Sequence, residues 1–422
     1  MRPPFLPFIL CLSLFLATGP ARAGLTLNQA EALWRQHSRE LKLAAVAVEA
    51  AAADQVTAGQ RQNPDLALNT LAISPWSGYR SGGWERKKMD TVLRVEQLIE
   101  RGGKRELRQR SADERLAAAR FAAEDLGRLQ LLDLRGAYFD LRLSQERLRL
   151  AQETAALYRR SVEAGQLRKK AGDIAPVDLA RLQIDLARAE TELRAAQAER
   201  ERAQQALAYL IGREAEAGEL QAADDWPLPT AAELQGASLD ARPDLAAARR
   251  RVAAAEAERE LARARRTRDV TVGMQYEHNL QNAPTNSYGF GVSVPLFIWH
   301  EYEGEIARAE ADLNTARLQF EQLQAQVGGE VAVARSALLA ARDRLRRIED
   351  GLLADARRVA DAAELAYRRG AMGLLDLLDA RRTQRQVEVE ALNARADYAR
   401  AWAAWTLQAN YQNQNNASGT KP

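Results

Sequence analysis

The stretch Tyr367-Arg-Arg-Gly-Ala-Met-Gly-Leu-Leu-Asp-Leu-Leu-Asp-Ala-Arg381 joins two long segments that carry the apolar pattern of helices. Gly370 and Gly373 predict a tight turn between these helices, because glycine readily takes the left-handed backbone conformation that ends a helix. Asp376 and Asp379 follow three residues apart. Both carboxylates are therefore expected on one face of the departing helix.

A turn of the same kind occurs about 198 positions earlier, in Lys169-Lys-Ala-Gly-Asp-Ile-Ala-Pro-Val-Asp-Leu-Ala-Arg181. Gly172 corresponds to Gly370 at this spacing, and Asp178 corresponds to Asp376. The chain is therefore predicted to be a duplication in which each half ends in a helical hairpin.

Each half is predicted to contain a helix, two strands, a long helix, a turn and a final helix. The first helix is expected to begin at Thr26, where Gln29 completes a capping box, and to end near Gly59. Alternation of apolar and polar residues predicts the strands. They lie at residues 66–71 and 89–99 in the first half, and 269–276 and 288–294 in the second.

The two longest helical segments carry apolar residues at every seventh position, which predicts left-handed supercoiling against a neighbouring helix. The first runs from Lys104 to Lys170, and its length of on the order of 100 Å follows from the rise per residue. The second begins near Tyr302. The repeated positions are Leu134, Leu141, Leu148 and Ala155 in the first helix, and Leu338, Leu345, Leu352, Val359 and Ala366 in the second.

The composition excludes several classes of protein. Positive and negative charges nearly cancel, so nothing indicates a nucleic-acid partner, and the interleaved charges are typical of solvated helix faces. The single cysteine, Cys11, lies in a predicted signal peptide, which leaves no thiol for a disulfide or metal site. The three histidines are scattered, and no catalytic pair or nucleotide motif occurs. We therefore expect no enzyme, no cofactor and no bound metal.

These patterns divide the chain into five parts. They are a signal peptide (1–23), a first repeat (24–213), a connector (214–236), a second repeat (237–411) and a disordered C-terminal tail (412–422). Four strands cannot close a barrel alone, and open strand edges favour assembly. Three chains would supply twelve strands, each long enough to cross a membrane when tilted. The expected fold is mainly helical, with long antiparallel coiled-coil hairpins and a shared outer-membrane barrel.

Four further motifs occur in a definite order along the chain. These are Asn63-Pro64-Asp65-Leu66, Glu96-Gln97-Leu98 with Gly102-Gly103-Lys104-Arg105, Arg242-Pro243-Asp244-Leu245, and Val294-Pro295-Leu296-Phe297. Through these motifs and the two turns, the chain resembles the TolC-like outer-membrane efflux family over nearly all of its mature sequence. The compact length and the Gly-Gly-Lys-Arg segment are most similar to the cobalt–zinc–cadmium branch of that family.

The resemblance implies a homotrimer in the outer membrane, with a twelve-stranded barrel in the lipid and a helical tunnel in the periplasm. It also implies two protein partners, a periplasmic adaptor and an inner-membrane resistance-nodulation-division pump. Many relatives carry a lipidated N-terminal cysteine, which this sequence lacks. The function expected is an exit duct for divalent heavy-metal cations. Alternatives are a duct for drugs or for type I protein secretion, and a structural periplasmic scaffold.

The resemblance gives the two turns specific roles. Asp376 and Asp379 match aspartates that ring the periplasmic entrance of the tunnel, where carboxylates from several chains attract cations. Asp173 and Asp178 are expected to cap a helix or contact the adaptor, together with Gly172, Gly370 and Gly373. The cations that flank the turns are expected to form salt bridges between helices or to meet the adaptor; they are Lys169, Lys170, Arg368 and Arg369.

Overall fold

The computed structural model describes residues 24–71, 90–229, 242–279 and 285–409. The predicted signal peptide, the predicted C-terminal tail and the aromatic loop that contains Trp76, Tyr79 and Trp84 lie outside the described residues. The described residues fall into two compact units. Unit 1 comprises the described residues within 24–37, 134–228 and 345–400, and unit 2 those within 38–133, 229–344 and 401–409.

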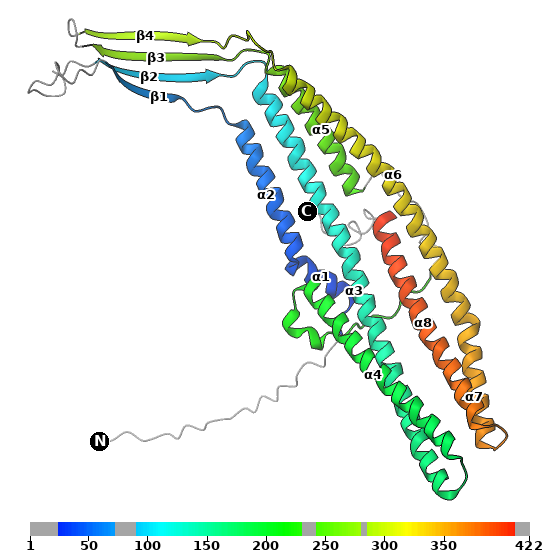
Figure 1. The fold of residues 1–422 in the computed structure, drawn as a ribbon. Helices are drawn as coiled ribbons and strands as arrows, with labels where there is room; N and C mark the ends of the chain where they lie inside the picture. The colour runs from blue at the N-terminus through cyan, green and yellow to red at the C-terminus, as the bar shows by residue number, and fades with distance from the viewer. Residues whose placement is uncertain (1–23, 72–89, 230–241, 280–284, 410–422) are drawn as a thin grey trace, which may run out of the picture. The chain divides into compact units, whose positions relative to one another are not determined.

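Unit 2 contains one antiparallel sheet with the strand order β1-β2-β3-β4, so that β1 and β4 form its two edges (Figure 1). All four predicted strands are confirmed, and the two in the second half extend further toward the loop between them. The strands are β1 (Asp65–Leu71), β2 (Asp90–Ile99), β3 (Val270–Asn279) and β4 (Thr285–Ser293).

The register of the sheet separates its two faces by chemistry. Val95 pairs with Leu66 on one side and Met274 on the other, and Met274 pairs with Phe290, so apolar side chains line up across the strands. Because side chains alternate along a strand, the intervening residues share the opposite face. That face is mostly polar or glycine, with Asn69, Arg94, Glu96, Gly273, Gln275, Glu277, Gly289 and Gly291, although it also carries Leu71, Val92 and Leu98.

The helices of unit 2 are tied to the sheet at the ends of β2 and β3. The buried Lys104 ammonium donates to the Thr267 carbonyl at 2.7 Å and to the Asp269 carboxylate at 2.8 Å. Gly102 is left-handed, and a Cβ there would lie 2.8 Å from the Thr267 side chain, so only glycine fits. The unit's helices are α2 (Arg39–Gly59), the first part of α3 (Lys104–Ala171), α5 (Pro243–Ala264) and α6 (Glu303–Arg347).

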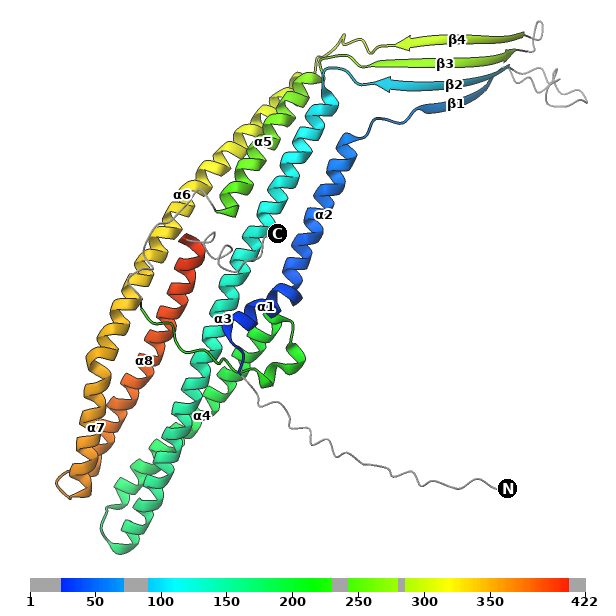
Figure 2. The ribbon, with the colours of Figure 1, turned by 180° about the vertical axis from the view of Figure 1, so that it is seen from behind.

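Two antiparallel hairpins dominate unit 1, and Figures 1 and 2 show each as a pair of helices joined by a short turn. The first hairpin is formed by α3 and α4, and the second by α7 and α8. Between Leu345 and α7 the chain passes through a π-helical turn, described below. The remaining bounds are α1 (Leu27–His37), α4 (Pro176–Ile211), the short helix η2 (Glu214–Glu219), the π-turn η5 (Ile348–Leu352), α7 (Leu353–Arg368) and α8 (Leu374–Ala409).

The first described residues are fixed into unit 1. The predicted capping box is confirmed, since Thr26 and Gln29 exchange hydrogen bonds of 2.9 and 3.3 Å. Leu25 forms a parallel bridge with Ala222, and its carbonyl accepts a bond from the Tyr138 hydroxyl at 3.0 Å. Burial raises the pKa of Tyr138 to about 12, so this hydroxyl stays protonated.

The prediction of one helix from Thr26 to Gly59 is wrong. The segment is two helices, because α1 ends at His37 and α2 begins at Arg39. Ser38 is buried, and its hydroxyl accepts the Leu41 N–H at 3.3 Å as an N-cap. A side-chain cap accepts a hydrogen bond from a backbone N–H that has no carbonyl partner at the start of a helix. A helix capped in this way does not have to continue the axis of the helix before it.

The heptad pattern is confirmed in α3, where Leu134, Leu141 and Leu148 are buried. In the second half it is only partly correct. Leu338 and Leu345 are buried, but Leu352 and Val359 are 45% and 56% exposed. The change follows the five-residue π-helical turn Ile348–Leu352, which separates α6 from α7.

The two halves of the duplication show what the π-turn does. Before the turn, buried positions correspond at a spacing of 197, as for Leu148 and Leu345. After it they correspond at a spacing of 198, as for Val162 and Ala360. The π-turn therefore contains one extra residue, and one residue turns an α-helical face by about 100°. This rotation carries Leu352 and Val359 out of the hairpin core.

Candidate functional site at the hairpin tips

The two hairpin turns have the same backbone structure, as the duplication predicts. Gly172 and Gly370 are left-handed, with φ of 83° and 76°. Beyond each glycine the next N–H bonds to a carbonyl five residues earlier, from Asp173 to Arg168 and from Ala371 to Ala366, both at 2.9 Å. These bonds define a Schellman motif, which closes the last turn of a helix.

Gly373 does not share this conformation, which corrects the expectation that both glycines turn the chain. It has no positive φ and directly precedes α8. A Cβ at this position would lie 3.5 Å from a carboxylate oxygen of Asp376, an ordinary contact. The left-handed conformation at the second tip therefore belongs to Gly370 alone.

The hairpins also repeat an ion pair that links their two helices. Arg159 and Glu190 lie 2.8 Å apart in the first hairpin, and Arg357 and Glu388 lie 3.6 Å apart at the equivalent positions of the second. All four side chains are at least partly exposed, so each pair contributes about 0.2–1 kcal/mol. The repeat of this contact confirms that the two hairpins are built alike.

Within unit 1 the two hairpins contact each other through ion pairs that the duplication does not repeat. One nitrogen of Arg382 on α8 lies 2.7 and 2.8 Å from the two oxygens of Asp185 on α4. Asp185 is buried, and this contact raises the pKa of the Arg382 guanidinium further above its usual range. Arg385 pairs with Glu192 further along the same two helices.

Nearer the tip, Arg168 of α3 meets Tyr367 of α7. The Arg168 guanidinium donates to the Tyr367 hydroxyl and also lies over the ring, 5.2 Å from its centroid. A cation over an aromatic face is attracted by the ring quadrupole. The contact joins α3, at the tip of the first hairpin, to the last turn of α7 in the second.

A cavity of about 230 Å³ lies between the hairpins at this level. Its walls are partly apolar, with Leu182 and Leu378, and partly charged, with Glu364 and Arg381. Glu364 accepts hydrogen bonds from Arg381 of α8 and Arg368 of its own helix, and these bonds hold the pKa of its carboxyl below the usual value. These ion pairs link α7 to α8 beside the cavity, and we call Glu364 with Arg381 and Arg368 the clasp.

The two predicted entrance acids lie at the start of α8. Asp376 and Asp379 are both exposed, and neither forms an ion pair with another of the described residues. Their neighbours on the buried side, Leu374 and Leu378, pack against the first hairpin. The acidic face of α8 is therefore directed away from the contact between hairpins.

For the other predicted tip residues, contacts within the chain bear on only one of the two roles expected of them. Asp178 does not cap α4, since the N-cap is Ala175 with no side-chain bond, and Asp178 instead lies 3.7 Å from Arg181. Arg368 pairs within α7 with Glu364 rather than between helices. Among the described residues, the remaining predicted tip cations form no ion pair in the chain; they are Lys169, Lys170 and Arg369.

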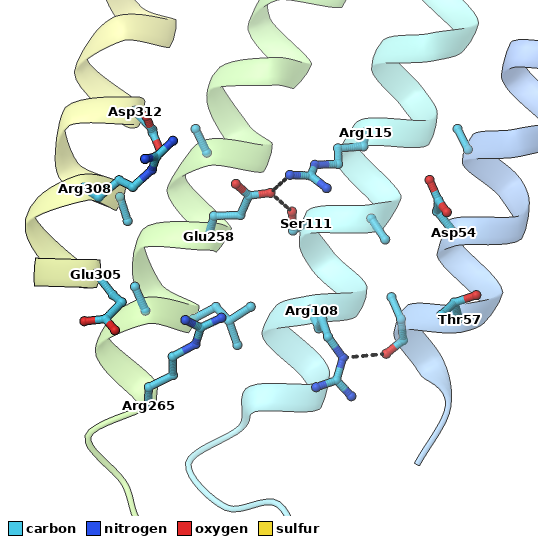
Figure 3. Close-up of a pocket in the computed structure, with 17 residues that line it drawn as sticks. Asp54, Thr57, Arg108, Ser111, Arg115, Glu258, Arg265, Glu305, Arg308 and Asp312 are labelled. Carbon is cyan, nitrogen blue, oxygen red and sulfur yellow. Dashed lines mark hydrogen bonds and ion pairs between the residues drawn. The ribbon is translucent and has the colours of Figure 1, made fainter. Parts of the chain in front are cut away.

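Unit 2 contains a larger cavity, of about 580 Å³, between α2, α3, α5 and α6 (Figure 3). Figure 3 shows Glu258 directed at Arg115 and Ser111, and the Ser111 hydroxyl donates to Glu258 at 2.8 Å. Arg108 donates to the Ala58 carbonyl at 3.3 Å. These polar groups are paired with one another between the helices, which favours a structural role for this cavity.

The described part of the chain holds no cluster of histidine, cysteine and acidic side chains suited to a metal ion. His278 is instead bonded to Asn286 at 2.7 Å, across the β3–β4 pair. Nor does any described helix combine the length and apolarity needed to cross a membrane.

Comparison with known proteins identifies the family. The model of the outer membrane efflux proteins matches residues 32–213 and 234–408, one segment in each half of the duplication. The chain belongs to the outer membrane efflux protein family. It is an outer-membrane channel with a periplasmic helical tunnel, and its family consists of channels rather than enzymes.

Similar proteins agree with this assignment. The cobalt-zinc-cadmium resistance protein CzcC of Cupriavidus metallidurans is 29% identical over 307 residues, which cover 70% of this chain and 71% of that protein. The outer-membrane channel OprN is 25% identical with a TM-score of 0.75, covering 90% of this chain and 89% of OprN. VceC of Vibrio cholerae is 21% identical with a TM-score of 0.75, covering 92% of this chain and 97% of VceC.

Outer membrane efflux proteins are trimeric parts of tripartite efflux systems. In this member the sequence located both tips and predicted that Asp376 and Asp379 share one face of α8, but it did not indicate the contacts between the hairpins. Arg168 with Tyr367, and Arg382 with Asp185, are about 200 positions apart in the sequence. The alternation of arginine with acidic residues in both hairpins is the one pattern in the sequence that could have predicted these contacts. Because that alternation occurs throughout the chain, it does not select particular pairs.

Proposed function

We propose that this chain forms a homotrimeric exit duct for divalent metal cations, served by a periplasmic adaptor and a resistance-nodulation-division pump. The substrate class is supported by the similarity to CzcC, a cobalt-zinc-cadmium resistance protein. The exposed acids at the start of α8 fit a cationic cargo. The pump supplies the energy, because the sequence carries no nucleotide-binding motif.

The observation that carries this proposal is the pair Asp376 and Asp379, exposed on one face of α8 with no ion pair to any residue that the structure describes. In a trimer, three copies would bring six such carboxylates around one axis. A ring of acids at a narrow opening concentrates cations and repels anions. Asp376 also lies in the first turn of α8, where the helix dipole favours a negative charge.

The tip cations are assigned to the adaptor. Lys169, Lys170 and Arg369 are exposed and form no ion pair in the described chain, so they are available to an acidic partner surface. Gly172 and Gly370 keep the two turns compact beside these cations. Together they would make the surface at which an adaptor docks.

Single-channel recording of the purified protein in planar lipid bilayers tests the duct and the ring. Wild type is expected to prefer cations and to be blocked by divalent or trivalent cations from the periplasmic side. The double variant Asp376→Asn/Asp379→Asn is expected to lose this block and to reduce the cation preference several-fold.

Asp173→Asn/Asp178→Asn is the matched control, because it removes two acids from the equivalent turn of the first half. Equal losses in both variants would contradict a ring made by α8. Absence of channels, with insertion verified, would contradict the duct. Metal tolerance of cells that carry the pump, with and without this chain, tests the cargo, and unchanged zinc, cobalt and cadmium tolerance would favour a drug or protein duct.

A further inference from the structure

The cavity between the two hairpins has an apolar part to its wall. Leu182 of α4 and Leu378 of α8 line it, and both are buried in one hydrophobic cluster. Leu157 of α3 and Leu377 of α8 extend this part of the wall. An apolar wall with a few polar groups beside it is typical of a site for a small organic molecule.

A pair of hydrogen-bond donors forms the polar part of the wall. Arg168 and Tyr367 both line the cavity, and the guanidinium donates to the hydroxyl. Arg168 forms no ion pair with another described residue, so the remaining N–H groups of its guanidinium are available. The Tyr367 hydroxyl hydrogen likewise has no acceptor among the residues that the structure describes. Two adjacent donors, one of them charged, suit the two oxygens of a carboxylate.

The ionisable residues of the wall carry an excess of positive charge. They are Arg168, Arg368, Arg381 and Glu364. The one glutamate accepts from two of these arginines in the clasp, which leaves Arg168 without a countercharge. Such a wall attracts an anion and repels a cation, and the apolar side chains beside it weaken the screening by water. The divalent cations of the proposed cargo therefore do not fit this cavity.

We propose that the cavity between the hairpins is a binding site for a small organic anion, a monocarboxylate with an apolar body. The carboxylate accepts hydrogen bonds from Arg168 and Tyr367, and the body lies against Leu182 and Leu378. The cavity volume of about 230 Å³ is below the roughly 300–1,000 Å³ of sites for drug-sized ligands. The ligand therefore has a single ring or a short alkyl chain.

The site is built from both hairpins, which gives its ligand an effect on the structure. Arg168 lies in α3, Leu182 in α4, Tyr367 in α7 and Leu378 in α8. A ligand that touches all four helices binds only while the hairpins are in contact, so its binding stabilises that contact by mass action. The anion is thus an effector of the channel rather than its cargo, and the site does not depend on which substrate the duct carries.

Saturation-transfer NMR with benzoate tests the site on the purified channel in detergent. A ligand of this size is expected to bind with a Kd on the order of 1 mM, which this method detects. Benzylamine, which has the same ring and the opposite charge, is the matched ligand control. Benzoate is expected to bind at least about tenfold more tightly than benzylamine, the difference made by a charge-assisted hydrogen bond.

Three variants separate the donors, the charge and the space. Tyr367→Phe keeps the ring beside Arg168 but removes one donor, and should weaken benzoate binding several-fold. Arg168→Gln removes the charge and should abolish measurable binding. Ser161→Leu fills the cavity while keeping every charge of the wall, and should also abolish it. Arg159→Gln is the matched control, because Arg159 lies on the same helix outside the cavity, and it should bind benzoate as wild type does.

Hydrogen exchange of the hairpins, with and without benzoate, measures the effect on structure and shows whether each variant keeps the hairpins in contact. Saturating benzoate should raise the protection of the four cavity helices in wild type and leave Arg168→Gln unchanged. If Arg168→Gln loses the contact between the hairpins, Tyr367→Phe and Ser161→Leu decide. Absence of benzoate binding by wild type, or equal binding of benzoate and benzylamine, would overturn the site. Binding without added protection would overturn the role of the anion as an effector.

Discussion

The Arg382 guanidinium on α8 and the buried Asp185 carboxylate on α4 lie 2.7 Å apart, and they join the two halves of a duplicated sequence through residues that the duplication does not repeat. The equivalent positions are Ile184 and Thr383. The duplication therefore explains each hairpin, whereas the contact between hairpins uses side chains particular to each half.

Arg382→Ala is expected to loosen the contact between α4 and α8, because it leaves the buried Asp185 carboxylate without its cation. Loss of one partner from a buried pair costs about 3–5 kcal/mol, and the partial exposure of Arg382 lowers the expected cost to about 1–3 kcal/mol. Hydrogen exchange of the tip segments measures it. Arg159→Ala, in an exposed pair, is the control and should cost under about 1 kcal/mol.

Gly172→Ala and Gly370→Ala are each expected to destabilise a hairpin tip by about 1–2 kcal/mol, the cost of a left-handed backbone for an L-residue. No neighbouring atom lies within 4 Å of the added Cβ at either position, so the effect is one of backbone alone. Gly373→Ala is the control, since its φ is not positive, and it should be neutral. Thermal unfolding with hydrogen exchange separates the three. A cost at Gly373 equal to that at Gly370 would argue against this account.

The clasp at Glu364 is expected to weaken only in acid. Arg381 lowers the pKa of the Glu364 carboxyl from its ordinary value of 4.5, so the folded protein holds the deprotonated form more strongly than the unfolded chain does. The stabilisation is therefore present above about pH 4.5 and lost as the pH falls through the lower folded pKa. The hydrogen-exchange protection factor at the end of α7, which is corrected for the intrinsic pH dependence of exchange, should be constant from pH 7 to pH 5 and lower below. Glu364→Gln should remove this pH dependence, and its persistence would assign the effect elsewhere.

Deletion of Gly351 is expected to be tolerated. It removes one residue from the π-turn, so an ordinary α-helix can form while the faces above and below keep their partners. Deletion of Glu153, at the equivalent position of the uninterrupted α3, has no such turn to absorb it and would rotate one flank by about 100°. The heat stability of the purified oligomer on a gel compares the two. Equal loss in both deletions would contradict the account of the π-turn.

Local signals in the sequence were sufficient for the parts of the fold that depend on neighbouring residues. The capping box of Thr26 and Gln29, the left-handed Gly172 and Gly370, and the alternating strands each follow from interactions within a few residues. Duplication strengthened these predictions, because the same pattern appears twice. The placement of Asp376 and Asp379 on one exposed face followed from helical spacing alone.

The parts that the sequence did not give depend on packing over long distances. The unbroken heptad through Leu352 and Val359 predicted one continuous buried face. The π-turn contains an extra residue, which rotates the helix so that Leu352 and Val359 are exposed. The break at Ser38 had a local signal, a serine able to cap Leu41, which the alanine-rich pattern around it outweighed. The partner of Asp185 could not be chosen from the sequence, since many arginines were equally available.

The sheet order β1-β2-β3-β4 has a consequence for how the molecule is made. A lone chain has unpaired backbone groups along β1 and β4 and a broad apolar face between them, so it is both incomplete and prone to aggregate. In a shared ring the last backbone hydrogen bonds form only when copies meet. The rate of maturation should therefore rise steeply with chain concentration, and newly exported chains need protection until two others arrive.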